Sequence, residues 1–320
     1  MNSVPSILII RLSSLGDVVL TLPVVTALRT RYPEARIDFL VRKEYAPILH
    51  RISEISNVIE LDTNSGRVGL RALRGELRKS GYSHVLDLHN NFRSQFLRRL
   101  AAERAIINKR TFQRWLLVNF KINVLKDEPD IVGRYFEVAK MLGVFDDGGA
   151  PTLPNFFARD KRLVAVAPGA RHWNKRWPVE HFVELIKTLI ADGRRVELFG
   201  SKDEREIGEA IMKQVASEHV QNLMGELTIT ETIDRMSRAT LAITNDSGLM
   251  HVASALGIKT VAIFGPTVRE FGFFPRARNA TVIENVGLPC RPCTAIGRAD
   301  CPEGHFLCLK NHDLRDFLDL

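Results

Sequence analysis

The chain has 320 residues, of which 45% are hydrophobic, and it carries 45 Lys and Arg against 37 Asp and Glu. This length exceeds the size at which one hydrophobic core usually stops growing, so it predicts two domains of roughly 150 residues each. The longest apolar stretches, such as 18–25, fall short of the ~20 residues that cross a bilayer. The first residues also lack the pattern of a secretory signal. We therefore expect a cytoplasmic protein.

Positive charge is concentrated in the first half of the chain. Residues 1–160 hold 24 Lys and Arg against 17 Asp and Glu, and residues 63–126 hold 14 against 3. Such a field attracts polyanions, although a solvated basic face without a ligand is the alternative. The sequence has no zinc-finger spacing, basic region with heptads or RNA-binding signature, which argues against nucleic acid. An anionic lipid or a phosphorylated saccharide fits better.

Short strands alternate with helices along both halves. The first half predicts strands at 7–12, 37–41, 58–61 and 85–88, with helices through 27–31 and near 69–79. The second half predicts strands at 163–167, 196–199, 241–244 and 260–264, with helices at 179–191, at 203–217 and after Ser247. This rhythm indicates an α/β fold of doubly wound parallel sheets. Gly, Pro and Asp at 146–151 indicate a linker between domains 1–150 and 151–320, with a ligand cleft between them.

The first candidate site lies where the strand at 7–12 runs into a helix through Ser13-Ser14-Leu15-Gly16-Asp17. Asp17 either complements the dipole of the helix or acts as a general base that takes the proton of an attacking hydroxyl. Pro23, inside the helical pattern, predicts a kink or an early end. The loop lacks G-x-G-x-x-G, which argues against a dinucleotide-binding oxidoreductase.

The second junction follows the strand at 163–167. Pro168-Gly169 predicts a turn where the backbone approaches a ligand, and Arg171, Lys175 and Arg176 lie just ahead of a helix. Cations at the positive end of a helix are mildly unfavourable, so a bound anion such as a diphosphate accounts for them. Surface cations on a loop are the alternative.

The third junction, Asp246-Ser247-Gly248, follows the strand at 241–244, and His251 lies one turn later. Asp246 or Ser247 either caps the helix or, with Gly248, presents a carboxylate, a hydroxyl and backbone N–H groups to a nucleotide. His251 is either a packed core residue or a ligand contact.

All four cysteines lie close together in the sequence, at Cys290, Cys293, Cys301 and Cys308. Disulfides are disfavoured in the cytoplasm, so the spacing leads to the hypothesis of a structural tetrahedral zinc site, with His305 and His312 as substitute ligands. Two labile disulfides or free thiols are the alternatives.

Three motifs in this order resemble bacterial lipopolysaccharide heptosyltransferases of glycosyltransferase family 9. They are S-S-L-G-D-V-V-L-T-L-P at 13–23, P-G-A-x-x-x-x-K-R-W-P at 168–178, and N-D-S-G-L-M-H at 245–251 followed by F-G-P-T. The resemblance covers nearly the whole chain. It implies a GT-B fold, in which two Rossmann-like domains face a central cleft, and a tail at 314–320 that packs on the first domain.

The resemblance also implies site residues. Asp17 is similar to the catalytic base of the family, and Lys175 to its diphosphate-binding lysine. The donor side would be formed by Gly169, Ala170, Arg171, Asp246, Ser247, Gly248 and His251. The acceptor side would be formed by Ser14, Gly16 and Arg93, the last in a stretch at 87–94 that resembles the family's acceptor loop. Ala170 and Arg171 stand where some heptosyltransferases have hydroxyl side chains.

The activity implied by the resemblance is an inverting transfer of heptose. The donor would be ADP-L-glycero-D-manno-heptose, bound by the C-terminal domain, and the acceptor the lipopolysaccharide inner core, bound by the N-terminal domain at the cytoplasmic face of the inner membrane. No cofactor would be required, and contact with anionic lipid is expected. The alternatives are a related transferase with another nucleotide sugar, and a non-catalytic nucleotide-sugar or polyanion binder that tolerates loss of Asp17.

Overall fold

The computed structural model describes residues 4–101, 103–310, 312 and 314. The chain forms two compact units, which we call the first unit (Met1–Thr111 and Pro129–Pro154) and the second unit (Phe112–Glu128 and Asn155–Leu320). Each is built on a parallel sheet, which confirms the predicted α/β class. The predicted division at residue 150 assigned 112–128 to the first domain, whereas their contacts group them with the second unit. Among the described residues, no helix is long and apolar enough to span a membrane.

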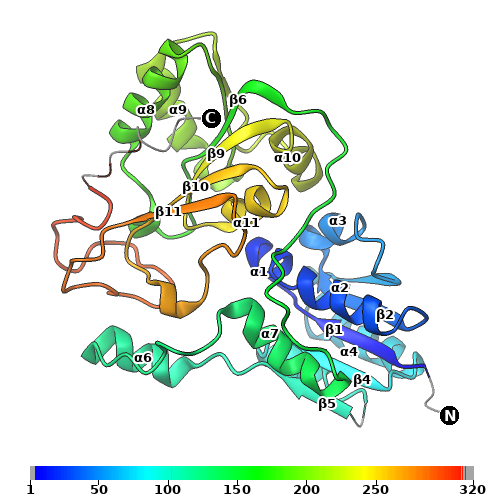
Figure 1. Cartoon of the computed structure of the whole chain (residues 1–320). Coiled ribbons are helices and arrows are strands. Elements are labelled where there is room, and N and C mark those ends of the chain that lie inside the picture. The colour runs from blue at the N-terminus through cyan, green and yellow to red at the C-terminus, as the bar shows by residue number, and fades with distance from the viewer. Residues whose placement is uncertain (1–3, 102, 311, 313, 315–320) are drawn as a thin grey trace. The chain divides into compact units, whose positions relative to one another are not determined.

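The first unit contains a five-stranded sheet of order β3-β2-β1-β4-β5 (Figure 1). Its strands are β1 Ser6–Ile10, β2 Arg36–Arg42, β3 Asn57–Leu61, β4 His84–Asp87 and β5 Glu103–Ile106. Its helices are α1 Leu15–Val19, α2 Leu22–Arg31, α3 Ala46–Leu49, α4 Gly66–Lys79, α5 Phe92–Leu97 and α7 Ile131–Ala139. One core cluster of this unit contains Leu8, Ile10, Leu40 and Val85. Strands that are covered on both faces are almost continuously apolar.

The predicted break at Pro23 is confirmed. The helical pattern after the first strand is divided into α1, which ends at Val19, and α2, which begins at Leu22. Pro23 lies in the first turn of α2. A backbone N–H at this position would have no acceptor within the helix, so proline loses no helical hydrogen bond here. The sharp division leaves α1 as a single short helix at the end of β1.

The second unit contains a six-stranded sheet of order β11-β10-β9-β6-β7-β8 (Figure 1). Its strands are β6 Asp160–Ala167, β7 Arg195–Leu198, β8 Val220–Asn222, β9 Ala239–Asn245, β10 Lys259–Phe264 and β11 Ala280–Glu284. Its helices are α8 Val179–Ala191, α9 Arg205–Val215, α10 Ile229–Met236 and α11 Gly248–Ala255. Leu314 belongs to the core of this unit. Residues 315–320, the rest of the predicted packing tail, lie outside the described residues.

The segment 112–128 carries α6 (Thr111–Phe120) and packs on the second unit. Leu117 and Leu125 form a small core with Phe271. Lys121 donates from Nζ to the carbonyl oxygens of Cys290 (3.1 Å) and Pro292 (2.6 Å). The chain thus contributes to the second unit before it returns to the first unit through α7.

A buried polar cluster in the first unit joins β2, β3 and the segment before β4. Tyr82, which precedes β4, donates its hydroxyl to Asp38 Oδ2 on β2 at 2.7 Å, and Asn57 on β3 donates to Asp38 Oδ1 at 2.8 Å. Asp38 and Tyr82 are 4% and 6% exposed. A carboxylate at this depth is tolerated only with hydrogen-bond partners.

We expect Tyr82→Phe to lower the free energy of unfolding by about 1.5–3 kcal/mol, because it removes a hydrogen bond to a buried charge. Tyr32→Phe is the matched control, since the Tyr32 hydroxyl donates to the neutral, partly buried carbonyl of Leu142 at 2.8 Å. Guanidinium denaturation measures both variants. A loss in Tyr82→Phe no larger than that in Tyr32→Phe would show that the Asp38 cluster does not stabilise the sheet.

Candidate functional site

Each sheet has one point where the strand order reverses, between β1 and β4 in the first unit and between β6 and β9 in the second unit. In doubly wound sheets, ligands bind outside the carboxyl ends of the strands at such a switch point, because the adjoining connections leave toward opposite faces. The three junctions singled out in the sequence follow β1, β6 and β9. The loop after β4 completes the first switch point.

Asp17 is held at the end of β1 by a buried arginine. Arg11 Nη2 lies 2.6 Å from Asp17 Oδ1, and these side chains are 9% and 18% exposed. Arg11 also donates from Nη1 to the carbonyl oxygen of Leu88 at 2.6 Å. A single guanidinium therefore connects the loop after β1, the loop after β4 and the carboxylate.

Asp17 also performs the structural role that the sequence left open. It is the third residue of α1, and its Oδ2 accepts from the backbone N–H (3.2 Å) and the hydroxyl (2.7 Å) of Ser14, the N-cap residue. A carboxylate in the first turn also complements the helix dipole. Gly16 lies between these two residues and is buried. These contacts fix the orientation of the carboxylate at the carboxyl edge of the sheet.

The surroundings of Asp17 contain three buried titratable side chains. Burial lowers the pKa of Arg11, but the Asp17 carboxylate and its hydrogen bond outweigh this and raise it overall. Burial, with the positive charges of Arg11 and Lys109, lowers the pKa of His89 to about 3. Burial raises the pKa of Tyr135 against the opposing effect of Arg11. At neutral pH the site thus holds a charged guanidinium, a neutral imidazole and a neutral phenol.

His89 is a candidate functional residue that the sequence interpretation did not select. It is 8% exposed, and its Nδ1 has no hydrogen-bond partner in the part of the chain that the structure describes. Buried polar atoms are normally paired, so this unpaired nitrogen marks His89 as a candidate functional residue. Its signal in the sequence was its position directly after the apolar strand at 85–88.

The loop after β4 is organised by Asp87, which is fully buried. Its Oδ1 accepts from the N–H groups of His89 (3.0 Å) and Asn90 (2.7 Å), and its Oδ2 accepts from the Ser94 hydroxyl (2.9 Å). The side chain of Arg98 adds a contact at 3.4 Å. Asp87 is therefore a scaffold that fixes residues 88–94.

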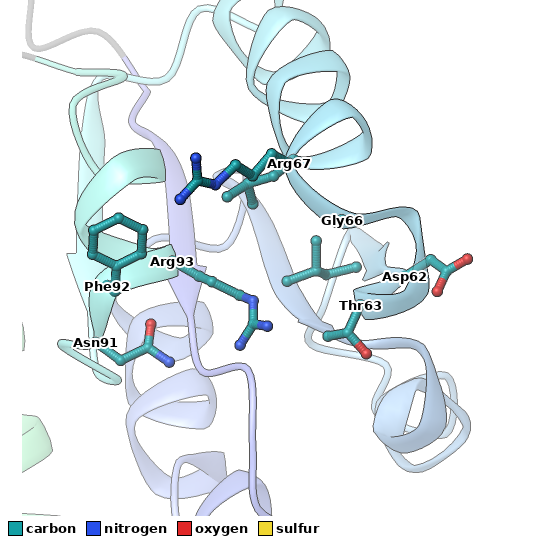
Figure 2. Close-up of a pocket in the computed structure, with 9 residues that line it drawn as sticks. Asp62, Thr63, Gly66, Arg67, Asn91, Phe92 and Arg93 are labelled. Atoms are coloured by element: carbon teal, nitrogen blue, oxygen red, sulfur yellow. The ribbon is translucent and has the colours of Figure 1, made fainter.

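Arg93 lines a pocket of about 400 Å³ in the first unit. The walls come from the end of β3, the start of α4 and the start of α5, and they include Leu61, Thr63, Leu70 and Asn91. Figure 2 shows the guanidinium groups of Arg67 and Arg93 projecting into this space from its two sides, while the Asp62 carboxylate points away. Phe92 is 79% exposed. Two cations and an aromatic ring suit an anionic sugar.

In the second unit, Lys175 and Asp246 form an ion pair. Lys175 Nζ lies 2.6 Å from Asp246 Oδ2, and the side chains are 14% and 8% exposed. The hydroxyl of Thr267, on the loop after β10, donates to the same oxygen at 2.7 Å. Residues from the loops after β6, β9 and β10 thus meet at one edge of the sheet.

Asn245, the last residue of β9, fixes the loop after β6. Its Oδ1 accepts from Trp177 N at 3.0 Å, and its Nδ2 donates to the carbonyl oxygen of Pro168 at 2.7 Å. Arg176 Nε donates to the Ala170 carbonyl oxygen at 2.7 Å within the same loop. Asn245 and Thr267 are further residues that the sequence interpretation did not select, and their polar character at strand ends was the available signal.

The three cations of the second junction have different surroundings. Lys175 pairs with Asp246, whereas Arg176 donates from Nε to the Ala170 carbonyl oxygen, which is neutral and leaves the guanidinium charge in place. Arg171 is exposed and has no polar partner among the described residues. Burial, with the charges of Lys175 and Arg171, lowers the pKa of the neighbouring His172. A bound anion would be attracted by Arg171, by Arg176 and by the accessible side of Lys175.

The remaining donor-side predictions lie along the same edge. Ser247 is the N-cap residue of α11 and makes no side-chain capping bond, and Gly248 is the first helical residue. His251 is 6% exposed. A Cβ on Gly169 would lie 2.3 Å from the carboxyl carbon of Glu204, so this position requires glycine or a shift of Glu204. The roles of these residues in donor binding stay predictions.

The four cysteines are free thiols. Burial raises the pKa of Cys293 and of Cys308, the latter to about 11. Cys290 Sγ lies 3.8 Å from His305 Nε2, and His312 Nε2 lies 3.0 Å from the Cys308 carbonyl oxygen. Within the described residues, no three His, Cys, Asp or Glu side chains are grouped closely enough to hold a metal ion. The structural zinc site stays a prediction from spacing.

The site residues therefore form two groups. The structure brings Ser14, Gly16 and Asp17 together in the first unit, with Arg93 in a pocket of the same unit. It brings Lys175 and Asp246 together in the second unit, although 70 residues separate them in the sequence. Arg11, His89, Asn245 and Thr267 complete these groups.

Comparison with known proteins identifies the family. Residues 70–301 match the model of glycosyltransferase family 9 (heptosyltransferase). The chain is 30% identical to lipooligosaccharide heptosyltransferase 2 of Haemophilus influenzae over 87% of this chain and 88% of that protein. It is 31% identical to lipopolysaccharide heptosyltransferase 2 of Salmonella typhimurium, over 83% and 84% of the two chains.

Among solved structures, the chain is similar to ADP-heptose LPS heptosyltransferase II of E. coli, with a TM-score of 0.72 and 29% identity. The likeness covers 95% of this chain and 97% of that one. It confirms the predicted GT-B architecture of two doubly wound domains, and the family match confirms the resemblance carried by the three motifs. The chain belongs to glycosyltransferase family 9, the heptosyltransferase family.

Proposed function

We propose that this glycosyltransferase transfers heptose from ADP-L-glycero-D-manno-heptose to the inner core of lipopolysaccharide. One observation carries the proposal: the switch-point loops of the two sheets present complementary chemistry, a carboxylate in the first unit and cations in the second unit. A glycosyl transfer requires both, a base for the acceptor and positive charge for the leaving diphosphate. The names of the relatives include ADP-heptose and lipopolysaccharide, which supports a donor and an acceptor of these kinds.

The second unit would bind the donor. Lys175 and Arg171 would contact the diphosphate, and the N–H groups of Gly248 and its neighbours at the start of α11 would add hydrogen bonds. Asp246 holds Lys175 and is itself held by Thr267, so the ammonium group is positioned before the donor arrives. Preorganised positive charge stabilises a leaving diphosphate without reorganisation during the reaction.

The first unit would bind the acceptor and supply the base. In the proposed step, the acceptor hydroxyl oxygen attacks the anomeric carbon, its proton passes to Asp17, and the bond from carbon to the diphosphate oxygen breaks. ADP leaves with the bonding electron pair, and the anomeric configuration is inverted. Arg11 orients Asp17 through the ion pair between their side chains. No step needs a cofactor.

The pocket of Arg67 and Arg93 would hold an acidic group of the acceptor, while Phe92 packs against a sugar ring. This gives Arg93 the acceptor-binding role expected from the sequence. Because the acceptor is a membrane lipid, we further propose that the protein works at the cytoplasmic face of the inner membrane, and the basic stretch 63–126 supports this.

Asp17→Asn should lower kcat at least about 100-fold, because it removes the base but keeps the shape of the side chain. The affinity for ADP, measured by calorimetry, should stay within about twofold, since the substitution lies in the first unit.

The matched control is Asp130→Asn, which alters a carboxylate that caps α7 and accepts from Gly133 N at 2.9 Å. It should keep wild-type turnover. If Asp17→Asn retained activity, Asp17 would be only a helix cap, and the non-catalytic binder would become the better account.

Lys175→Ala should weaken ADP binding at least about tenfold through loss of a charged contact to the diphosphate. Calorimetry with ADP, UDP and GDP measures both affinity and base preference. Lys187→Ala, an exposed lysine on α8 paired with Glu184, is the control.

The double variant Lys175→Ala with Asp246→Asn separates two explanations. If Lys175 contacts the diphosphate, the double variant still binds ADP weakly. If it only neutralises Asp246, ADP affinity returns to the wild-type value and our assignment of Lys175 is wrong. A preference for UDP or GDP would favour a transferase with another donor.

Arg67→Gln and Arg93→Gln should each raise the KM for the acceptor about tenfold, with kcat and ADP affinity unchanged, because each removes one charge-assisted contact in the pocket. Steady-state kinetics at saturating donor measures the change. Arg78→Gln, at the far end of α4, is the control. Equal KM values for Arg78→Gln and the two pocket variants would show that the general basic field, and not the pocket, binds the acceptor.

A further inference from the structure

The segment 290–309, which follows β11 and carries the four cysteines, has no role in the function proposed above. We call it the cysteine segment. It belongs to the second unit, as do the loops that would bind the donor. It contacts two of these loops, the one after β10 and the one after β6. The contacts start from different residues of the segment and both lead to Lys175.

Arg291 makes the first contact. Its Nη2 donates to the carbonyl oxygen of Thr267 at 2.6 Å and to Glu284 Oε2 at 2.7 Å, and the side chain is buried. The Thr267 hydroxyl in turn donates to Asp246, and Asp246 holds Lys175. A chain of direct contacts therefore leads from Arg291 to the ammonium group of Lys175.

The turn at 294–298 makes the second contact, through the residue that precedes Lys175. Asn174 is 1% exposed, and its Oδ1 accepts from Arg298 N at 2.8 Å. Its own N–H donates to the Arg298 carbonyl oxygen at 3.3 Å. Within the turn, the Thr294 hydroxyl accepts from Gly297 N at 2.9 Å. Two hydrogen bonds to Arg298 therefore fix the loop after β6 next to Lys175.

Gly297 lies directly against the loop after β6. Its φ is +130°, and a Cβ at this position would lie 2.3 Å from Cγ and 2.4 Å from Cβ of His172. Rotation of the imidazole cannot relieve a contact at the base of the side chain, so the backbone of His172 would have to move. The His172 carbonyl oxygen accepts from Lys175 N at 3.1 Å. The position of Lys175 therefore depends on the absence of a side chain at Gly297.

We propose that the cysteine segment positions Lys175 for the donor diphosphate, with Arg291 and Gly297 as positioning residues. The inference rests on the proposed function in one respect, namely that Lys175 binds the diphosphate. Arg291 restrains the carboxylate partner of Lys175, and Gly297 allows the close packing that restrains its backbone. Neither residue touches the donor in this account. A charge-assisted contact depends on its geometry, so a small shift of the loop lowers the affinity for ADP.

The first test is the affinity of Gly297→Ala for ADP, measured by calorimetry. It should fall about fivefold, because the added methyl group displaces His172 and with it Lys175. The matched control is Gly304→Ala. Gly304 also has a positive φ, +67°, but a Cβ there would meet no atom within 4 Å. The control should bind ADP as the wild type does. Equal affinities of the two variants would overturn the role of Gly297.

The second variant, Arg291→Lys, leaves the Gly297 turn unchanged. It keeps a positive charge opposite Glu284 but loses the guanidinium fork that also holds the Thr267 carbonyl. We expect ADP affinity to fall about threefold. The control is Arg235→Lys, because Arg235 donates to Glu197 on β7 and to Gln221 on β8 and contacts neither of the two loops. Wild-type affinity in Arg291→Lys would overturn the role of Arg291.

A double-mutant cycle separates positioning from a general effect on the fold. Each variant is combined with Lys175→Ala, and ADP affinity is measured again. If the cysteine segment acts through Lys175, neither substitution should weaken ADP binding further once the lysine is absent. Losses that add in full to that of Lys175→Ala would show that the segment stabilises the second unit without positioning Lys175, and would overturn the proposal.

Heptose transfer by the wild type distinguishes this inference from the proposed function. If the wild type transferred no heptose but the losses in ADP affinity were non-additive with Lys175→Ala, the proposed reaction would fail and the positioning of Lys175 would stand. If heptose were transferred but Lys175→Ala bound ADP as the wild type does, the reaction would stand and the positioning proposal would fail. A wild type that bound no ADP would overturn both.

Discussion

The parallel pairing of β1 with β4 and of β6 with β9 is the constraint on which the rest of the structure depends. Parallel strands end at the same edge of a sheet, so each pairing brings two loops together that are far apart in sequence. In the first unit these loops carry Asp17 and His89. In the second unit they carry Lys175 and Asp246, and β10 adds Thr267. The positions of Asp17 and His89 in the first unit, and of Lys175 and Asp246 in the second unit, follow from these pairings.

Within the first unit, Arg11 connects the loops after β1 and β4 and positions Asp17. It is a buried cation at the end of an apolar strand, and it is tolerated because Asp17 pairs with its Nη2 and the Leu88 carbonyl accepts from its Nη1. Asp17 in turn caps α1 through Ser14. The same contacts that stabilise the helix therefore fix the carboxylate for its proposed reaction. A structural and a catalytic role for Asp17 are compatible, and the sequence presented them as alternatives.

Much of the fold could be predicted because its signals are local. The helix Val179–Ala191 has the predicted bounds, since Pro178 precedes it and its apolar residues recur with helical spacing. The break at Pro23 follows from the missing N–H of proline. By contrast, α6 was not predicted, because a helix that is apolar on two faces lacks the amphipathic period by which helices are found. The short strand β5 was missed in the same region.

The residues of the candidate site could be predicted from the sequence, but the contacts between them could not. Asp17 and Asp246 were selected by residue type at strand ends, and Lys175 as a cation just ahead of a helix. The pairing of Lys175 with Asp246 was not predicted, because local sequence does not determine which side chains from separate loops meet. For the same reason, the hydrogen bond from Arg176 to the Ala170 carbonyl was not predicted, and the role of Arg176 toward a bound anion stays a prediction. His89 was missed because its environment is created by Arg11 and Asp17, which lie far away in the sequence.

The central claim is that this chain transfers heptose with inversion, and the direct measurement is product analysis with ADP-L-glycero-D-manno-heptose and an inner-core acceptor. Liquid chromatography would follow ADP, and NMR would assign the anomeric configuration of the new linkage. We predict one ADP released for each heptose transferred, and a linkage inverted relative to the donor. Release of ADP without a heptosylated product, or a linkage with retained configuration, would contradict the account.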